Sequence, residues 1–130
     1  MKVVADASAL AAVIFEEDGA SEVRDRLQGA SIWAPELLKL ELANTALKKA
    51  RRNPERAPEI FARLGDFKEL RRGIQWHDVH PVDVAILASL TGLSAYDASD
   101  LCLAGWLEAD LVTLDRRLAA VKGMATEAAD

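Results

Sequence analysis

Four acidic residues stand beside apolar segments, where a role as solvated surface charges does not explain them. An ionised carboxylate beside an apolar core costs free energy unless a partner compensates its charge. Four that converge would raise one another's pKa values, and a divalent cation would relieve the repulsion. The four are Asp6 after the apolar stretch KVVA, Glu41 within LKLELANTAL, Asp97 within LSAYDASDLCLA, and Asp115 at the end of LVTLD.

Capping of helices is the competing explanation for three of these acids. Asp6 precedes a helix expected to begin near Ser8, and Asp115 directly precedes the helical segment RRLAAV. Asp97 lies three residues after Ser94, the spacing of a capping box. Taken singly, each of the three fits a capping role at least as well as a chemical one.

Glu41 does not fit a capping role. It lies too deep in its expected helix to cap it, and its neighbours are mostly leucines. The near cation Lys39 is only two residues away, so it points from another face of the helix. An unpaired glutamate in apolar surroundings therefore favours a functional site.

The expected donor set consists of oxygen atoms. Cys102 is the single cysteine, and it falls in an apolar helical pattern that favours a packed thiol. His77 and His80 lie far in sequence from every acidic motif, and we interpret them as surface or turn residues. Carboxylate ligands without a histidine or cysteine cluster predict Mg²⁺ or Mn²⁺ as the cofactor, rather than Zn²⁺.

Alternating strand and helix patterns indicate how the acids are positioned. Such alternation predicts a three-layer α/β domain, with a central parallel sheet flanked by helices. Ligands gather at the carboxyl ends of such strands, and all four acids belong near that edge. We expect strands at residues 2–5, 31–34, 74–79 and 109–115, and helices at 8–15, 21–28 (capped by Ser21), 36–52, 58–70, 82–91, 94–107 and 116–121.

Composition sets broad limits on the protein. The 130 residues, with 51% hydrophobic and 28% charged side chains, predict one globular domain spanning 1–130. No apolar run reaches the ~20 residues of a membrane span, and we expect a cytoplasmic protein with no membrane partner. The net charge of −5 argues against a protein that coats nucleic acid by its overall charge. It does not argue against a nucleic-acid-binding protein whose acids are concentrated at one site and whose bases lie elsewhere.

The order of the motifs VVADASAL, LKLELANTAL, LSAYDASDLCLA and LVTLDRRL resembles that of the PIN-domain nucleases. Within that family the chain looks closest to the VapC-type toxins of toxin–antitoxin pairs, and the resemblance covers essentially its whole length. It implies that Asp6, Glu41, Asp97 and Asp115 are the catalytic and metal-binding residues. Among them, Asp6 and Asp97 are the foremost candidates for direct metal contact.

The same resemblance implies a function. It implies a metal-dependent endoribonuclease that hydrolyses RNA phosphodiester bonds, forms a homodimer and is blocked by a VapB-type antitoxin. The alternative is a catalytically inactive PIN-like module that binds protein or RNA. A HAD-type phosphatase is disfavoured, because its second aspartate would stand where this chain has Ser8. A phosphoacceptor receiver domain is disfavoured as well, since adjacent acids after the first strand are missing.

Two further residues are candidate accessories to the site. Family members commonly carry an aromatic or aliphatic residue three positions after the acid at Asp97, whereas this chain has Asp100. Asp100 is either a fifth acid or a solvated neighbour, and we favour the solvated neighbour. The Ser8 hydroxyl either faces the phosphate or a bound water, or caps a helix.

Basic residues near the acids are candidates for RNA contact. Arg116 and Arg117 follow Asp115 directly, which places them beside the expected pocket. Lys48 and Lys49 lie near the end of the helix that carries Glu41. Cations near a helix carboxyl end are also favourable without any ligand, so RNA or antitoxin contact there is one of two explanations.

Overall fold

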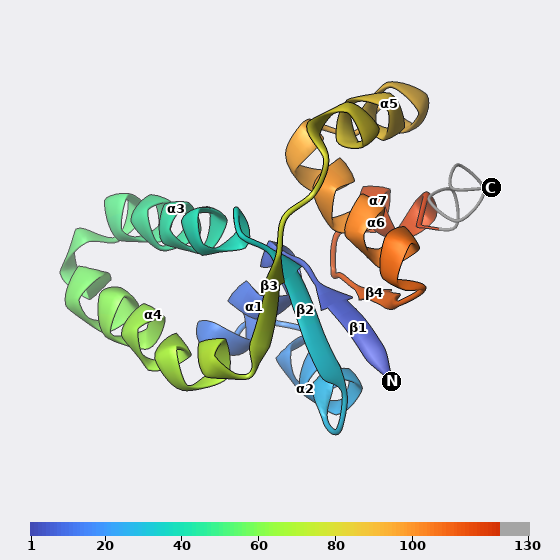
Figure 1. Cartoon of the computed structure of the whole chain (residues 1–130). Coiled ribbons are helices and arrows are strands. Elements are labelled where there is room, and N and C mark those ends of the chain that lie inside the picture. Colours follow the sequence, from blue (N-terminus) through green and yellow to red (C-terminus); the bar gives the residue numbers. More distant parts are fainter. Residues whose placement is uncertain (123–130) are drawn as a thin grey trace.

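The computed structural model describes residues 1–122, apart from the side chains of residues 69–71. No helix in this range is both long and apolar enough to cross a bilayer. The strands are β1 (Lys2–Ala5), β2 (Ser31–Pro35), β3 (Ile74–His77) and β4 (Asp110–Val112). The helices are α1 (Ala7–Ile14), α2 (Ala20–Leu27), α3 (Leu38–Arg52), α4 (Ala57–Arg72), α5 (Pro81–Thr91), α6 (Ala95–Leu107) and α7 (Arg116–Ala120), with a 3-10 turn η1 (Pro54–Arg56) before α4 (Figure 1).

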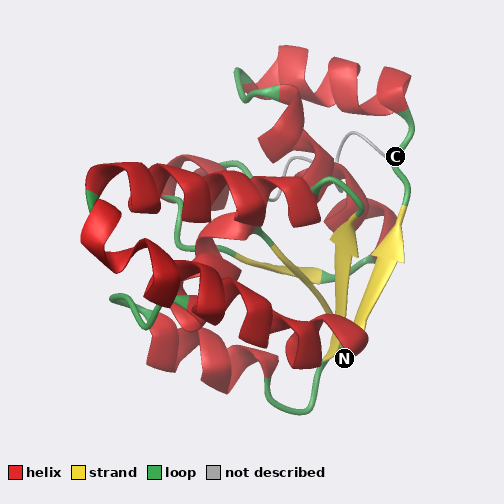
Figure 2. Ribbon diagram, turned by 90° about the vertical axis from the view of Figure 1, so that its left-hand side faces the viewer, coloured by secondary structure: helices red, strands yellow, loops and turns green. Residues whose placement is uncertain are grey.

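The strands form one parallel sheet in the order β3-β2-β1-β4. Val4 of the central strand β1 pairs with Trp33 of β2 on one side and with Leu111 of β4 on the other. Because the strands are parallel, their carboxyl ends meet at one edge of the sheet. The side view in Figure 2 shows helices in red around the yellow strands, and the predicted three-layer α/β class is confirmed.

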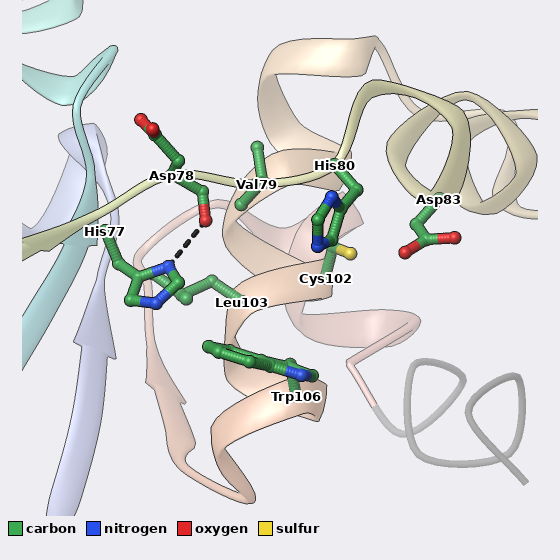
Figure 3. Close-up of a pocket in the computed structure, with 8 residues that line it drawn as sticks. All are labelled: His77, Asp78, Val79, His80, Asp83, Cys102, Leu103 and Trp106. Atoms are coloured by element: carbon green, nitrogen blue, oxygen red, sulfur yellow. Dashed lines mark hydrogen bonds between the residues drawn. The ribbon is translucent and has the colours of Figure 1, made fainter.

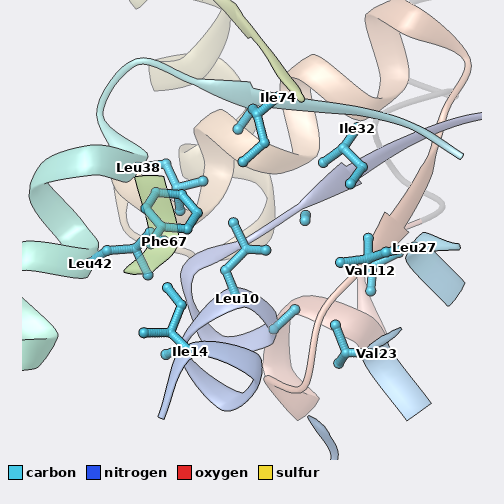
Figure 4. Packing of buried hydrophobic residues seen from close by; sticks show 14 of the residues in the cluster. Leu10, Ile14, Val23, Leu27, Ile32, Leu38, Leu42, Phe67, Ile74 and Val112 are labelled. Atoms are coloured by element: carbon cyan, nitrogen blue, oxygen red, sulfur yellow. The ribbon is translucent and has the colours of Figure 1, made fainter. Parts of the chain in front are cut away.

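The two faces of the sheet bury different helices. Successive side chains of a strand point to opposite faces, so Val3 and Val4 join separate clusters. Val3 packs in the cluster of α1, α2, α3 and α4, where Figure 4 shows Leu10 of α1 close to Leu38 of α3 and Phe67 of α4. Val4 packs in the cluster of α5, α6 and α7, with Leu101 of α6 among its members.

Helices α3 and α4 run side by side away from the sheet, as both views show (Figures 1 and 2). Near the sheet they share the large cluster through Leu42 and Phe67. Farther out, a small cluster of buried Ala46, Ala50 and Ile60 holds them together. The first turn of α3, which carries Glu41, therefore lies at the end of this pair that is anchored to the sheet.

Some element boundaries differ from those predicted. Helix α2 begins at Ala20 after Gly19, not after Ser21 as predicted. Gly19 has a φ of +89°, and a Cβ atom there would lie 2.8 Å from Leu114 Cδ1, so the turn requires a glycine. Strand β4 is shorter than expected and ends at Val112, which leaves a loop before Asp115.

A candidate acidic active site

Asp6 follows the central strand and is buried, with 4% of its surface exposed. Its backbone N–H donates to the Val112 carbonyl at 3.2 Å, which continues the pairing of β1 with β4. Its Oδ1 accepts hydrogen bonds from the Ala9 N–H at 2.9 Å and the Ser8 hydroxyl at 2.8 Å. Asp6 therefore caps the first helix, as the competing explanation for it had it, although α1 begins one residue earlier than predicted, at Ala7.

Thr113 is a residue of this site that the sequence reasoning missed. Its hydroxyl donates to Asp6 Oδ2 at 2.5 Å and accepts from the Asp115 N–H at 3.0 Å. It also lies 3.2 Å from the Ser8 hydroxyl, which in turn accepts from the Leu114 N–H at 3.0 Å. The available signal was a hydroxyl residue two positions before Asp115, at the end of a strand paired with β1.

Opposing effects act on the Asp6 carboxyl. Burial raises its pKa most, and the nearby Asp115 raises it further. The hydrogen bonds from Thr113, Ala9 and Ser8 stabilise the ionised form and oppose this rise. The net direction is upward.

Glu41 does not cap α3, as expected, but it lies in the first turn, because α3 begins at Leu38 rather than at residue 36 as predicted. Its Oε1 is buried and has no hydrogen-bond partner within the described part of the chain. Burial raises the pKa of Glu41 from 4.5 to about 7, with smaller contributions from Asp97 and Asp6. The Asp97 and Asp6 carboxyls that act on Glu41 come from other elements of the fold.

Asp97 and Asp115 lie near the starts of two helices, at the same edge of the sheet as Asp6. Asp97 lies in the first turn of α6, and its N–H donates to the Ser94 hydroxyl at 3.1 Å. Burial and then Asp115 raise the pKa of Asp97, against the effects of Ser94 and Arg117. Asp115 caps α7 by accepting from the N–H groups of Arg117 and Leu118 through Oδ1, at 2.9 and 3.3 Å. The competing explanation for Asp115, a helix cap, therefore holds as well.

Asp100 is the largest difference from expectation at this site. The favoured interpretation as a solvated neighbour is wrong, because Asp100 is only 1% exposed. Helix α6 packs against β1 and β2, so the face of α6 that carries Asp100 is turned toward the sheet rather than the solvent. Burial raises its pKa well above the ordinary value, and the carboxylates of Glu41, Asp6 and Asp97 raise it further, in that order.

The candidate site therefore consists of carboxyls that follow β1, lie in the first turns of α3 and α6 and cap α7, at the carboxyl edge of the sheet. Within residues 1–122, no three acid, histidine or cysteine side chains already surround a common point at metal-ligand distance. The donor chemistry nevertheless fits a hard divalent cation, because all donors are oxygens. Two of these oxygens, Glu41 Oε1 and Asp100 Oδ1, are buried without a hydrogen-bond partner among the described residues.

The predicted basic residues divide into two groups. Arg117 opposes the rise in the pKa of Asp97, and its Nη2 donates a hydrogen bond to the Gly92 carbonyl at 3.4 Å. Arg116 is exposed. Lys48 lines an open groove of about 430 Å³ together with Glu41. Lys49 lies elsewhere, ion-paired with Glu17 and 5.3 Å from the centre of the Phe15 ring.

The groove beside Glu41 combines several kinds of side chain. Its other lining residues include Asn44, Tyr96 and Leu40, and both Tyr96 and Leu40 are strongly exposed. The groove therefore brings a cation, an amide, an aromatic ring and an apolar side chain together beside the Glu41 carboxyl.

The two histidines lie in a separate pocket of about 80 Å³ (Figure 3). The His77 ring stands between Trp33 and Trp106, with centroid distances of 6.3 and 4.6 Å, and its Nδ1 lies 2.5 Å from the Asp78 carbonyl oxygen. Cys102 lines the same pocket, and burial raises the pKa of its thiol. None of the four predicted acids lines this pocket.

Comparisons with known proteins point to one family. Residues 3–124 match the family described as PIN domain. Over 122 residues the chain is 34% identical to Ribonuclease VapC3 of Pyrobaculum aerophilum, covering 92% of this chain and 93% of that protein. Its fold is similar to the crystal structure of PAE2754 from Pyrobaculum aerophilum, with a TM-score of 0.70, 26% identity, and coverage of 99% of this chain and 96% of the other.

Proposed function

The chain belongs to the PIN-domain family, and from this premise we propose that it is a metal-dependent endoribonuclease acting as the toxin of a toxin–antitoxin pair. The observation that carries the proposal is the buried Oε1 of Glu41, which has no hydrogen-bond partner among the described residues, together with the effect of Asp97 and Asp6 on its pKa. Such a group is costly in a protein without a ligand for it. Similarity to a protein named as a ribonuclease supports the same conclusion.

The cofactor in this proposal is Mg²⁺ or Mn²⁺. Asp6, Glu41, Asp97 and Asp115 would hold it, and Ser8 and Thr113 would orient the Asp6 carboxylate through their hydroxyl donors. The cation would neutralise the phosphate and lower the pKa of an attacking water. Without it, Glu41 carries a proton for much of the time near neutral pH, because its pKa is about 7.

RNA is the proposed substrate, and exposed basic residues beside the acids are its proposed contacts. Arg116 and Arg117 adjoin Asp115, and Lys48 lines the groove next to Glu41. Phosphate groups entering this edge would meet these cations before they reach the acids. Lys49 contributes less to this proposal, because Glu17 already neutralises it. The expected products carry 5′-phosphate and 3′-hydroxyl ends.

The proposed protein partners are a VapB-type antitoxin and a second copy of the chain. The groove beside Glu41 offers the antitoxin apolar contact at Leu40 and an approach to the acids. A ribonuclease toxin acts where cellular RNA is present, so we place it in the cytoplasm.

Cleavage of a fluorescently labelled RNA by the purified protein tests this function. We expect cleavage with Mg²⁺ or Mn²⁺, none in EDTA, and a loss of about 100-fold or more in Asp97→Asn. The matched control is Asp25→Asn on α2, an exposed aspartate remote from the acidic motifs in sequence, which should cleave like the wild type. Unchanged cleavage by folded Asp97→Asn contradicts the proposed site.

The alternative function is a binding module without catalysis. It predicts that the wild type retains the RNA in a gel-shift experiment, and that the RNA stays intact with either cation. Cleavage in the presence of Mn²⁺ that stops on addition of EDTA excludes this alternative.

A further inference from the structure

Asp100 has an environment that a carboxyl group rarely occupies without a reason. It is 1% exposed, and its Oδ1 has no hydrogen-bond partner within the described part of the chain. Its neighbours along α6 include the equally buried Ala98 and Leu101. Within residues 1–122, leaving aside the side chains of 69–71, no lysine or arginine forms an ion pair with it.

This arrangement destabilises the fold when nothing is bound. Burial of a carboxyl without a full set of partners costs free energy, whether the group is charged or protonated. An apolar side chain of similar volume would serve the packing of α6 better. The position is therefore better explained by a ligand than by packing.

The surroundings of Asp100 identify the kind of ligand. The charges that act on it come from Glu41, Asp6 and Asp97, all of them candidate metal ligands. Asp97 lies three residues before it on α6, so both project from nearly the same face of that helix. Glu41 Oε1 is likewise buried, with no hydrogen-bond partner among the residues that the structure describes. A cation is the ligand whose charge would suit this group.

We infer that Asp100 is a fifth carboxylate of the cation site, which raises affinity for a divalent cation and lowers the stability of the cation-free protein. The existence of a cation rests on the proposed function, whereas the part assigned to Asp100 rests on its burial, its unpartnered oxygen and its neighbours. Retention of a destabilising group for ligand binding is a common trade-off at functional sites.

The test compares the wild type with Asp100→Asn and Asp100→Ala, using Mn²⁺ as the probe. The first variant keeps the shape of the side chain and removes its charge, and the second removes the polar group altogether. Mn²⁺ affinity is measured by calorimetry, and the melting temperature is measured in EDTA and in Mn²⁺. The matched control is Ser99→Ala, which removes a neighbouring buried hydroxyl that donates to the Tyr96 carbonyl at 2.6 Å.

We expect both Asp100 variants to bind Mn²⁺ about 10-fold or more weakly than the wild type. In EDTA, Asp100→Asn should melt above the wild type, because it removes the repulsion from the other carboxylates, and its gain in melting temperature on adding Mn²⁺ should be smaller. Ser99→Ala should bind Mn²⁺ like the wild type. Together these results separate a cation-binding role from a structural one.

Two results overturn the inference, and they differ from each other. If the wild type binds Mn²⁺ and both Asp100 variants bind it equally well, Asp100 is a structural residue and the proposed nuclease stands. If the wild type itself binds no Mn²⁺, the metal dependence of the proposed function fails together with the inference.

Discussion

Glu41 links the acidic site to the pH dependence of folding. Its pKa is raised from 4.5 to about 7, so between these pH values the cation-free folded protein binds more protons than the unfolded chain. The free energy of unfolding therefore falls as the pH rises through this range. Asp6, Asp97 and Asp100, whose pKa values are also raised, act in the same direction.

We predict that the urea midpoint in EDTA decreases from pH 5 to pH 7.5, and that Glu41→Gln flattens this decrease. The variant loses the titrating group but keeps nearly the same shape. Glu22→Gln on α2, an exposed glutamate, is the matched control and should follow the wild type. A wild-type midpoint that rises over this range contradicts the raised pKa.

Some features of the candidate site could be predicted from the sequence and others could not. The lack of a partner for Glu41 could be predicted, because it stands among leucines and its near cation, Lys39, points from another face of the helix. The burial of Asp100 could not be predicted, since the sequence does not specify which face of α6 packs on β1 and β2. Thr113 was missed because its partner Asp6 is 107 residues away in the chain.

At the scale of elements, Thr113 connects the carboxyl ends of β1 and β4. Its single hydroxyl donates to Asp6 and accepts from the Asp115 N–H. We predict that Thr113→Val lowers the free energy of unfolding by about 1–3 kcal/mol, because it leaves a buried carboxylate oxygen without its donor. Thr113→Ser keeps the hydroxyl and should retain most of the stability, as measured by urea unfolding. Equal losses in both variants would assign the effect to the methyl group instead.

The order and type of the elements could be predicted, but several boundaries could not. The apolar strands and the helices between them follow from periodicity, and these patterns are strong in this chain. The start of α2 depends instead on the left-handed turn at Gly19, where a side chain would meet Leu114, a residue far away in the sequence. Strand β4 ends at Val112 because residues 113–115 turn to form the hydrogen bonds around Asp6 and α7.

At the scale of the whole molecule, α5 presents an apolar face to the solvent. Val82, Ile86 and Leu90 recur every four residues and are each more than half exposed. We expect this face to form the interface of the proposed homodimer. The prediction is that Ile86→Asp shifts the mass measured by light scattering from dimer to monomer. A dimeric Ile86→Asp, or a monomeric wild type, contradicts it.

The position of β1 at the centre of the sheet has a consequence for the synthesis of the protein. The first strand made on the ribosome must wait for the last one, β4, before Asp6 gains its bonds to Thr113 and Val112. Contacts of such long sequence separation form late, after the intervening loop has closed. Under the proposed function, cleavage would therefore begin only after residues 112–115 have been synthesised and Val112 and Thr113 have bonded to Asp6.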